Sequence, residues 1–547
     1  MVGRLKAFSR RAIGQRADGW FLLTMVVAFV LAGPILAVFA AATQSSEDLW
    51  SHLASTVLPR YVFNTLILVV GVSVVAVVFG VSTAWIVSRY DFPGVSLLRW
   101  MLLLPAAAPA YIVAYAYVDF FEFAGPVQGA LREIFGWRSA RDYWFPEIRS
   151  MGGAIVVIGS VLYPYVYMMA RTSFVQTPVS LCDVAAIANR RVLWSVTLPL
   201  ARPAIAAGLA LVMMETISDF GTVEFFAVET LTLGIFNVWL GMNSLPAAAQ
   251  IASLCFLFII ALLVLEYVAR AKRRFVGGER RSAMLRVKKV FGFQAVICQT
   301  ICLLPIFIGF VIPVSILVDL AASQDLPPWR GSLASATSNS LVLSLIVSLC
   351  VAAIAVVLVI GSRHHFGRIG RLIITFASSG YAFPGVILAI GVLTFAGYFD
   401  GLLRSVLGFG GLSAGYGLVV FACVVRFQAV GTGALMAGME RIPGNLVNAS
   451  RTLGRSFNDS IRVIVLPLLS RSLVACGLFV FVDTMKELPM TLLLRPFNFE
   501  TLPTFVYQYA KDELLEEAAV PALAIIAVGV LPVIAMNFVL NKVSAKT

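Results

Sequence analysis

Long apolar segments alternate with short polar or basic ones along almost the whole chain. Each apolar segment is close to the length of about 20 residues that an α-helix needs to cross the hydrocarbon core of a membrane. The pattern therefore predicts an all-α polytopic membrane protein with about twelve transmembrane helices. The predicted spans lie near residues 20–42, 62–88, 100–121, 151–170, 204–226, 249–269, 293–319, 338–361, 372–397, 414–434, 472–492 and 518–540.

The first apolar segment has the basic flank and small final residues of a signal peptide. Its apolar core runs from Trp20 to Ala42, 23 residues, whereas the core of a signal peptide has roughly 7–15. We therefore predict a retained helix.

The composition agrees with a membrane protein. Of the 547 residues, 60% are hydrophobic and 13% are charged, whereas soluble domains have about 45–50% and about 25%. This difference excludes a soluble enzyme and a disordered chain. Most of the seven cysteines lie in apolar segments, so we expect no disulfide framework; Cys298 and Cys302 share a helix face and are expected to be packing residues.

The distribution of Lys and Arg predicts the orientation. With the N-terminus in the cytoplasm, the inside segments hold 30 of the 41 basic residues and the outside loops hold 9. The positive-inside rule then places both termini in the cytoplasm. The basic stretch Arg270–Lys289 is interpreted as a cytoplasmic linker on anionic lipid, so the expected partner is the lipid bilayer and not nucleic acid.

Two halves of the chain repeat one another. "NTLIL" at Asn64 returns as "NSLVL" at Asn339, and a proline follows each asparagine by 45 residues, Pro109 and Pro384. We therefore predict a first half at 1–269, a basic linker at 270–290 and a second half at 291–547, each with six spans. Because six spans return the chain to its starting side, the repeats are parallel.

A long cytoplasmic loop follows the fourth span of each half. The loop at 448–467 reads "NASRTLGRSFNDSIRVIVLP" and resembles the EAA loop of ABC importer permeases. The residues on that pattern are Asn448 (in place of Glu), Ala449, Gly454, Ile464, Leu466 and Pro467.

The loop at 183–199 is a shorter version of the same pattern. It reads "DVAAIANRRVLWSVTLP" and spans 17 residues instead of 20. Asn189 stands at the turn in place of glycine, because Asn is the next-best residue for a left-handed conformation. The corresponding residues are Asp183, Ala185, Ala186, Asn189, Leu198 and Pro199. We name 183–199 and 448–467 the first and second EAA-type loops.

The resemblance implies that these loops couple the chain to an ATPase. In that family the segment forms a helix that docks in a cleft of the ATPase subunit. The chain contains no G-x-x-x-x-G-K-[ST] sequence, so we predict a permease and not an enzyme, with no cofactor bound by this chain. The implied partners are two copies of an ATPase that uses ATP-Mg and a periplasmic substrate-binding protein.

Two further stretches, 214–242 and 482–523, resemble ferric-iron permeases of the Fbp/Sfu/Hit type, which fuse both halves. The implied function is passage of Fe³⁺ across the bacterial inner membrane. Thiamine, phosphonate, polyamine and sulfate permeases share the scaffold and remain alternatives. A secondary transporter driven by an ion gradient is the rival class, and a membrane-embedded enzyme comes third.

Repeated acids follow each Leu-Pro pair at equal distance. Glu215 and Asp483 lie 16 residues beyond the prolines, and Asp219 and Glu487 follow four residues later, with Lys486 beside them. One interpretation is a carboxylate-lined path for a hard cation. The other is structural, with the acids holding helix ends or pairing with Lys486 and Arg495.

No metal site is predicted. The tyrosines at 111, 115, 117, 163, 165 and 167 could supply ferric ligands, but they are expected to be packing residues. His364 and His365 are adjacent and do not share a helix face.

Overall fold

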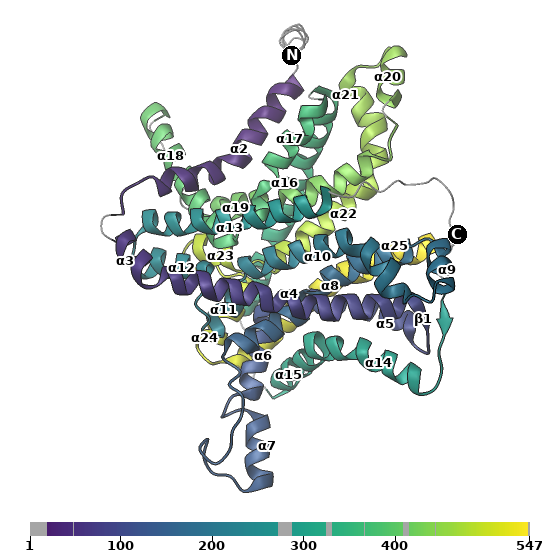
Figure 1. Cartoon of the computed structure of the whole chain (residues 1–547). Coiled ribbons are helices and arrows are strands. Elements are labelled where there is room, and N and C mark those ends of the chain that lie inside the picture. The colour runs from purple at the N-terminus through teal and green to yellow at the C-terminus, as the bar shows by residue number, and fades with distance from the viewer. Residues whose placement is uncertain are drawn as a thin grey trace. The chain divides into compact units, whose positions relative to one another are not determined.

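The computed structural model describes residues 19–46, 49–271, 287–323, 331–365, 367–407, 415–443 and 445–544. Helices account for nearly all of this part of the chain (Figure 1). The described residues form two compact units, each of which draws on both sequence halves. The predicted boundaries of the halves, at 269 and 290, stay a prediction.

The larger unit comprises 41–339, 486–492 and 499–547. Its long helix α4 (Leu58–Arg89) packs beside α8 (Met151–Val175) and α10 (Leu198–Ser218). The other elements are α3 (Leu49–Thr56), β1 (Tyr90–Asp91), α5 (Val95–Met101), η1 (Leu104–Ala107), α6 (Ala110–Phe121), α7 (Pro126–Phe135), α9 (Val179–Ile187), η2 (Leu193–Thr197), α11 (Gly221–Phe225), α12 (Leu231–Phe236), η3 (Asn237–Gly241), α13 (Leu245–Ala271), β2 (Lys288–Lys289), α14 (Phe293–Ile306), η4 (Phe307–Val311), α15 (Ile312–Ala322), α24 (Leu502–Lys511) and α25 (Leu515–Ser544).

The smaller unit comprises 1–40, 340–485 and 493–498. Helix α19 (Tyr416–Met439) packs along α22 (Leu466–Met485). The other elements are α2 (Gly19–Ala42), α16 (Gly331–His365), α17 (Gly367–Ala377), η5 (Ser379–Ala382), α18 (Gly385–Leu407), α20 (Asn445–Thr452), α21 (Phe457–Ser460) and η6 (Ile461–Val465), while α23 (Pro489–Leu494) connects the two units.

Small residues bring the three central helices of the larger unit together. A Cβ at Gly80 of α4 would clash with Val166 of α8, and one at Gly159 of α8 would clash with Val75 of α4. Gly208 of α10 lies against the α8 backbone in the same way. Such close backbone approach is how helices associate in lipid, where the hydrophobic effect does not drive one helix onto another.

All twelve predicted spans coincide with helices. Nine helices in the described residues are long and apolar enough to cross a membrane, and a tenth candidate is a bent pair. The two remaining predictions, 249–269 and 372–397, coincide with α13 and with the pair α17 and α18. The prediction of an all-α membrane protein is confirmed.

Four of the predicted spans are broken, which the hydropathy pattern did not indicate. The span at 100–121 bends by 87° at Pro109, and its repeat at 372–397 is interrupted before Pro384. The spans at 204–226 and 472–492 end early, at Ser218 and Met485, and are followed by the short helices α11 and α23. The prolines explain the first two breaks, because they lack a backbone N–H.

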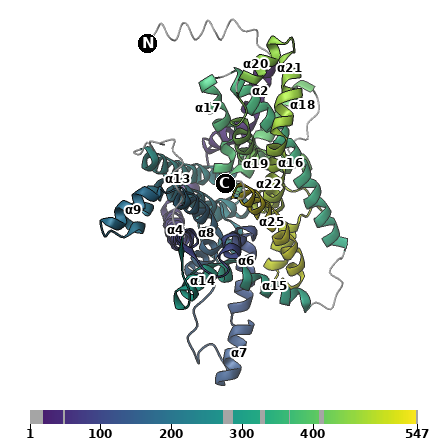
Figure 2. The ribbon, with the colours of Figure 1, turned by 90° about the vertical axis from the view of Figure 1, so that its right-hand side faces the viewer.

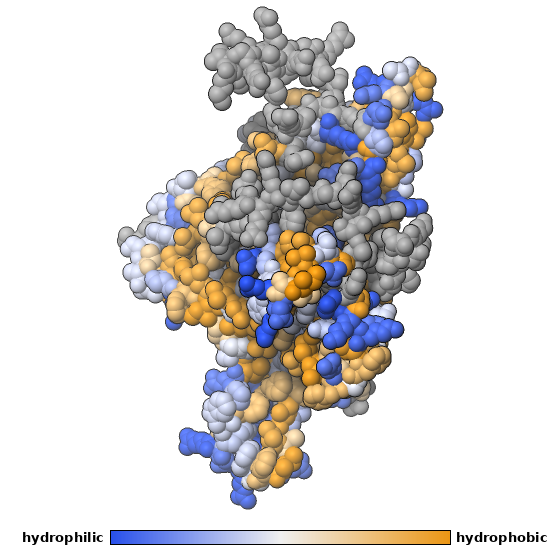
Figure 3. Space-filling view, turned by 45° about the vertical axis from the view of Figure 1, so that its right-hand side comes forward, coloured by the Kyte–Doolittle hydropathy of each residue, from blue (hydrophilic) through white to orange (hydrophobic). Residues whose placement is uncertain are grey.

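Apolar side chains cover much of the molecular surface, orange in Figure 3. On α4 the exposed residues include Leu66, Ile67, Val70 and Val74. The residues 275 positions later, on α16, are also exposed and apolar: Leu341, Val342, Leu345 and Leu349. Both helices therefore present the same face to lipid, in the register predicted from the two asparagines.

The asparagines themselves make equivalent hydrogen bonds. Asn64 Nδ2 donates to the carbonyl oxygen of Glu229 at 3.0 Å, and Asn339 Nδ2 donates to that of Glu500 at 2.9 Å. Glu229 and Glu500 each lie just before a short helix, α12 and α24. The sequence repeat is thus also a repeat of tertiary contacts.

The first helix of each half packs against the other half. Gly33 and Pro34 of α2 lie so close to Phe395 and Gly391 of α18 that a Cβ on either glycine would overlap its neighbour. In the larger unit, Gly309 in η4 of the second half lies against the backbone of Ser160 on α8. The opening helices are therefore exchanged between the halves.

Some predictions fall on residues that the structure does not describe. Residues 272–286 of the basic linker, the tail at 1–18 and the final residues 545–547 lie outside the described part, as do the side chains of His364 and His365. The end of the linker is described: Lys288 and Lys289 pair in parallel with Tyr90 and Asp91.

Candidate functional site: the EAA-type loops and the opposite ends of their helices

The second EAA-type loop is a helix, a turn and a second helix. Helix α20 ends at Thr452, and Gly454 follows with a φ of +89°. The N–H of Arg455 donates to Ser450 O at 3.3 Å, and the N–H of Gly454 donates to Arg451 O at 3.1 Å. These two bonds and the left-handed residue form a Schellman motif, which confirms the predicted turn at Gly454.

The first EAA-type loop has the same turn. Asn189 has a φ of +50°, the N–H of Arg190 donates to Ala185 O at 2.8 Å, and the N–H of Asn189 donates to Ala186 O at 3.0 Å. Asn189 therefore replaces glycine at the left-handed position, as predicted. Helix α9, which precedes the turn, projects away from α4 and α8 (Figure 2).

The three missing residues of the first loop lie after its turn. The second loop has the short helix α21 between Gly454 and its closing Leu466 and Pro467, capped by Ser456, whose Oγ accepts the N–H of Asp459 at 3.1 Å. The first loop has no counterpart of α21 in the described residues. The shortening therefore leaves the turn itself intact.

A π-helical turn precedes the Leu-Pro pair in both loops. It covers η2 in the first loop and η6 in the second, and its i→i−5 bonds run from Leu198 N to Leu193 O and from Leu466 N to Ile461 O. Pro199 and Pro467 lack the N–H that the preceding turn would use, which favours the wider geometry. Each loop thus continues without a break into a spanning helix, α10 or α22.

The turns carry exposed apolar side chains. Leu453 is 85% exposed, and Ile187 and Val184 are 86% and 64% exposed. The other predicted loop residues Asp183, Ala186, Asn448, Ala449 and Pro467 are also exposed, while Leu198, Pro199, Ile464 and Leu466 are half-buried and Ala185 is buried. Exposed apolar residues on a polar loop are typical of a surface that binds another protein.

The start of α2 is anchored to the second loop. Trp20 Nε1 donates to Asn458 Oδ1 at 2.7 Å, and its ring meets that of Phe457 edge-on at 6.0 Å. Ser460 Oγ donates to Ser450 Oγ at 2.9 Å and ties α21 to α20. The second loop is therefore joined to α2 by these contacts as well as to α22 by the continuous backbone.

Two of the repeated acids cap the short helices beyond the broken spans. Asp219 Oδ1 accepts the N–H of Thr222 and of Val223 at 3.0 and 3.1 Å, and its Oδ2 accepts the Thr222 hydroxyl at 2.8 Å. Glu487 Oε1 accepts the N–H of Met490 at 3.0 Å. These contacts agree with the structural interpretation, in which the two acids hold the ends of helices.

The remaining predicted residues lie on the adjoining helices. Glu215 and Asp483 are half-buried on α10 and α22. Lys486 Nζ donates to the carbonyl oxygen of Ala106 at 3.2 Å, and its stem contacts Gly529 of α25. A role of Glu215 and Asp483 in a common path stays a prediction.

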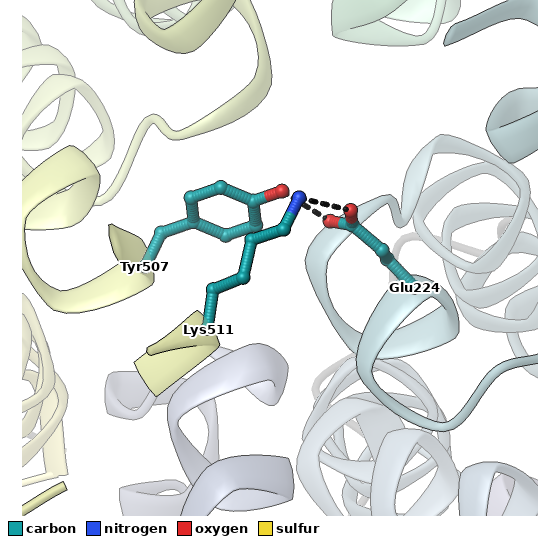
Figure 4. A network of polar contacts seen from close by, with 3 residues as sticks. All are labelled: Glu224, Tyr507 and Lys511. Atoms are coloured by element: carbon teal, nitrogen blue, oxygen red, sulfur yellow. Dashed lines mark hydrogen bonds and ion pairs between the residues drawn. The ribbon is translucent and has the colours of Figure 1, made fainter. Parts of the chain in front are cut away.

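The sequence analysis did not single out a polar network at the same end of the helices (Figure 4). Tyr507 OH donates to Glu224 Oε2 at 2.6 Å, and Lys511 Nζ lies 3.5 Å from Glu224 Oε1. Burial raises the pKa of Tyr507, and the hydrogen bond to Glu224 adds to this shift. The i, i+4 spacing of Tyr507 and Lys511 could have indicated that these two side chains share a helix face. Their partner Glu224 could not be found in this way, because it lies 283 positions before Tyr507.

A cavity of about 230 Å³ opens beside this network. It lies between α6, α11 and α24, beyond the end of α10 that is opposite the first EAA-type loop. Its lining residues are Tyr115, Arg149, Gly221, Glu224, Phe225, Tyr507, Ala510, Lys511 and Glu513.

The predicted packing role of the tyrosines agrees with several contacts. Tyr117 OH donates to Ile308 O at 2.5 Å, and Tyr167 OH donates to Arg99 O at 2.9 Å. Within the described residues no group of three or more His, Cys, Asp or Glu side chains could hold a metal ion.

Comparison with known proteins finds relatives among transport permeases. The chain is 22% identical to the Fe(3+)-transport system permease protein FbpB 2 of Haemophilus influenzae, over 97% of this chain and 100% of the relative. The sulfate transport system permease protein CysW of Escherichia coli is 26% identical over 51% of this chain and 96% of its own length.

The molybdenum transport system permease protein ModB of Escherichia coli is 27% identical over 36% of this chain and 88% of its own length. No protein-family model matches the chain. The sulfate and molybdenum relatives thus match 51% and 36% of the chain, whereas the Fe(3+)-transport relative matches 97% of it. The long apolar helices indicate a multi-pass membrane protein, and the chain is similar to transport-system permeases, over nearly its whole length to the Fe(3+)-transport permease.

Proposed function

We propose that this chain is the membrane subunit of an ATP-driven importer that carries ferric iron delivered by a binding protein. Both termini and both EAA-type loops face the cytoplasm, and one ATPase subunit docks on each loop. ATP-Mg is used by these partners and not by this chain.

The observation that carries the proposal is the pair of matching loops. Both contain the same Schellman turn at Gly454 and Asn189, expose apolar side chains beside it, and continue through a π-turn into a spanning helix. A secondary transporter has no need of two such rigid projections. An importer needs one for each ATPase subunit.

Rigid connection explains how a loop could transmit movement. Packed helices shift as units because their interiors do not deform continuously. A displacement of the second loop would therefore move α22 directly, and the Trp20–Asn458 hydrogen bond would carry α2 with it. Beyond α22 and α10, the acids Glu487 and Asp219 fix the short helices that would follow.

Ferric iron is favoured over an oxyanion by the extent of the match. The Fe(3+)-transport relative aligns over both halves and the connecting region, whereas the sulfate and molybdenum relatives align over about half of the chain or less.

The test is reconstitution. The chain, its ATPase and its binding protein are placed in liposomes, and uptake of radioactive iron, sulfate and molybdate is measured with and without internal ATP. We expect iron uptake that requires both partners. Uptake of sulfate or molybdate instead would assign an oxyanion cargo, and uptake by the chain alone under a proton or sodium gradient would establish a secondary transporter.

A further inference from the structure

The cavity between α6, α11 and α24 is rich in oxygen atoms that could bind a metal cation. Glu224 and Tyr507 approach each other closely, with 2.6 Å between the carboxylate and the hydroxyl. A carboxylate and a phenol are hard oxygen donors, the type that a highly charged cation prefers. They come from different halves of the chain, so the pair exists only when α11 and α24 are packed together.

A third hydroxyl lines the same cavity. Tyr115 is 2% exposed and lines the cavity. Its ring is held by Phe225 at 4.4 Å, edge-on, and by Tyr111 at 5.6 Å.

The cations at the cavity are already compensated. Arg149 Nε lies 2.7 Å from Glu122 Oε1. Lys511 is paired with Glu224 at 3.5 Å, but its side chain is 62% exposed. Exposed ion pairs of this type contribute little, so Lys511 can move into solvent and leave the Glu224 carboxylate to another cation.

We propose that this cavity is a transient ferric-ion site, in which Glu224 and Tyr507 are the ligands, Tyr115 lies within reach of a metal-bound water, and Lys511 occupies the place of the cation when the site is empty. The inference rests on the proposed function, because it concerns the cargo of that importer. Glu224 is on α11, which follows α10 directly, so this ligand is connected to the helix that continues from the first EAA-type loop.

Binding releases one proton. The phenol O–H bond of Tyr507 breaks as the oxygen coordinates Fe³⁺, and the proton passes to solvent. Iron binding should therefore weaken as the pH falls, by about tenfold per pH unit for one released proton. A site made of carboxylates alone would not show this dependence near neutral pH.

The experiment uses the purified full-length chain in lipid nanodiscs, titrated with ferric nitrilotriacetate. A tyrosinate bound to Fe³⁺ absorbs visible light by charge transfer, which reports directly on Tyr507. Tyr507→Phe should abolish this band, and Glu224→Gln should weaken binding at least about tenfold, since even loss of an indirect contact to a metal ligand costs roughly 10–100-fold.

Two further variants complete the design. Tyr509→Phe is the matched control, because Tyr509 lies on the same helix and stacks on Phe505 at 4.4 Å instead of lining the cavity; it should keep the band. Lys511→Met should leave iron affinity equal or higher, whereas a purely structural network would simply lose stability. Melting temperatures are measured for all variants.

The outcomes separate the site from the proposed function. No charge-transfer band in the wild-type chain, or a band and affinity that Tyr507→Phe leaves unchanged, would overturn the site. If reconstituted wild-type importer still takes up iron in that case, the proposed function stands without this site. If it takes up no iron at all, the proposed function fails.

Discussion

Replacing Gly454 tests whether the second EAA-type loop acts through its turn. Gly454 has a φ of +89°, and a Cβ at this position would meet no atom within 4 Å. The cost of a larger side chain is therefore conformational and not steric. A left-handed conformation costs an L-residue roughly 1–2 kcal/mol, and a β-branched residue lies at the upper end of that range.

We expect Gly454→Val to destabilise the docked conformation of the loop by about 2 kcal/mol, which corresponds to an affinity for the ATPase subunit lower by about thirtyfold. Gly454→Asn should be tolerated, because the first loop already has Asn189 in this conformation, at a φ of +50°.

The measurement is binding of the ATPase subunit to the permease in nanodiscs, followed by ATP-dependent iron uptake in liposomes. Gly433→Val is the control: a Cβ at Gly433 on α19 also meets no atom, but its φ is not positive. Wild-type ATPase affinity and uptake in the Gly454→Val protein would refute the reasoning, since the turn would then be dispensable.

Three further changes test the helices that the loops move. Asn64→Ala and Asn339→Ala each remove a hydrogen bond to a backbone carbonyl and should each destabilise the protein by about 1–3 kcal/mol, read as a lower melting temperature in detergent; unequal effects would argue against equivalent roles. Asp219→Ala removes the cap of α11 and should cost about 1–2 kcal/mol, with Asp219→Asn retaining part of it; an unchanged melting temperature would show that α11 does not need this cap. Glu215→Gln combined with Asp483→Asn should lower iron uptake per inserted molecule more than it lowers protein abundance, and full uptake per molecule would remove these residues from the path.

The spans and the turns could be predicted because both are local properties of the sequence. Apolar segments of sufficient length define the helices. Gly454 and Asn189 are the residue types that adopt a left-handed conformation at least cost. The repeat around Asn64 and Asn339 was also visible, and the structure adds that both side chains bond to equivalent carbonyls.

The breaks near Asp219 and Lys486 could not be predicted from hydropathy. The first break has no proline, whereas Pro489 lies three residues after Lys486 and begins α23. The chain leaves the helix because the Asp219 carboxylate caps the next one and the Lys486 ammonium bonds to Ala106. The Lys486–Ala106 contact joins distant segments and leaves no local pattern, and the Glu224–Tyr507 pair was missed for the same reason.

The exchange of opening helices has a consequence for how the protein is made. Gly33 on α2 lies against Phe395, 362 positions later in the chain. At a synthesis rate of about 5–20 residues per second, α2 must wait in the bilayer for roughly 20–70 s before its partner emerges.

During that interval the α2 surface at Gly33 and Pro34 is in contact with lipid instead of α18. Neither half can therefore complete its own fold while the ribosome is still working on the other. A gene split between the halves would turn this wait into a bimolecular search, which the single chain avoids by keeping α2 tethered to its eventual neighbours.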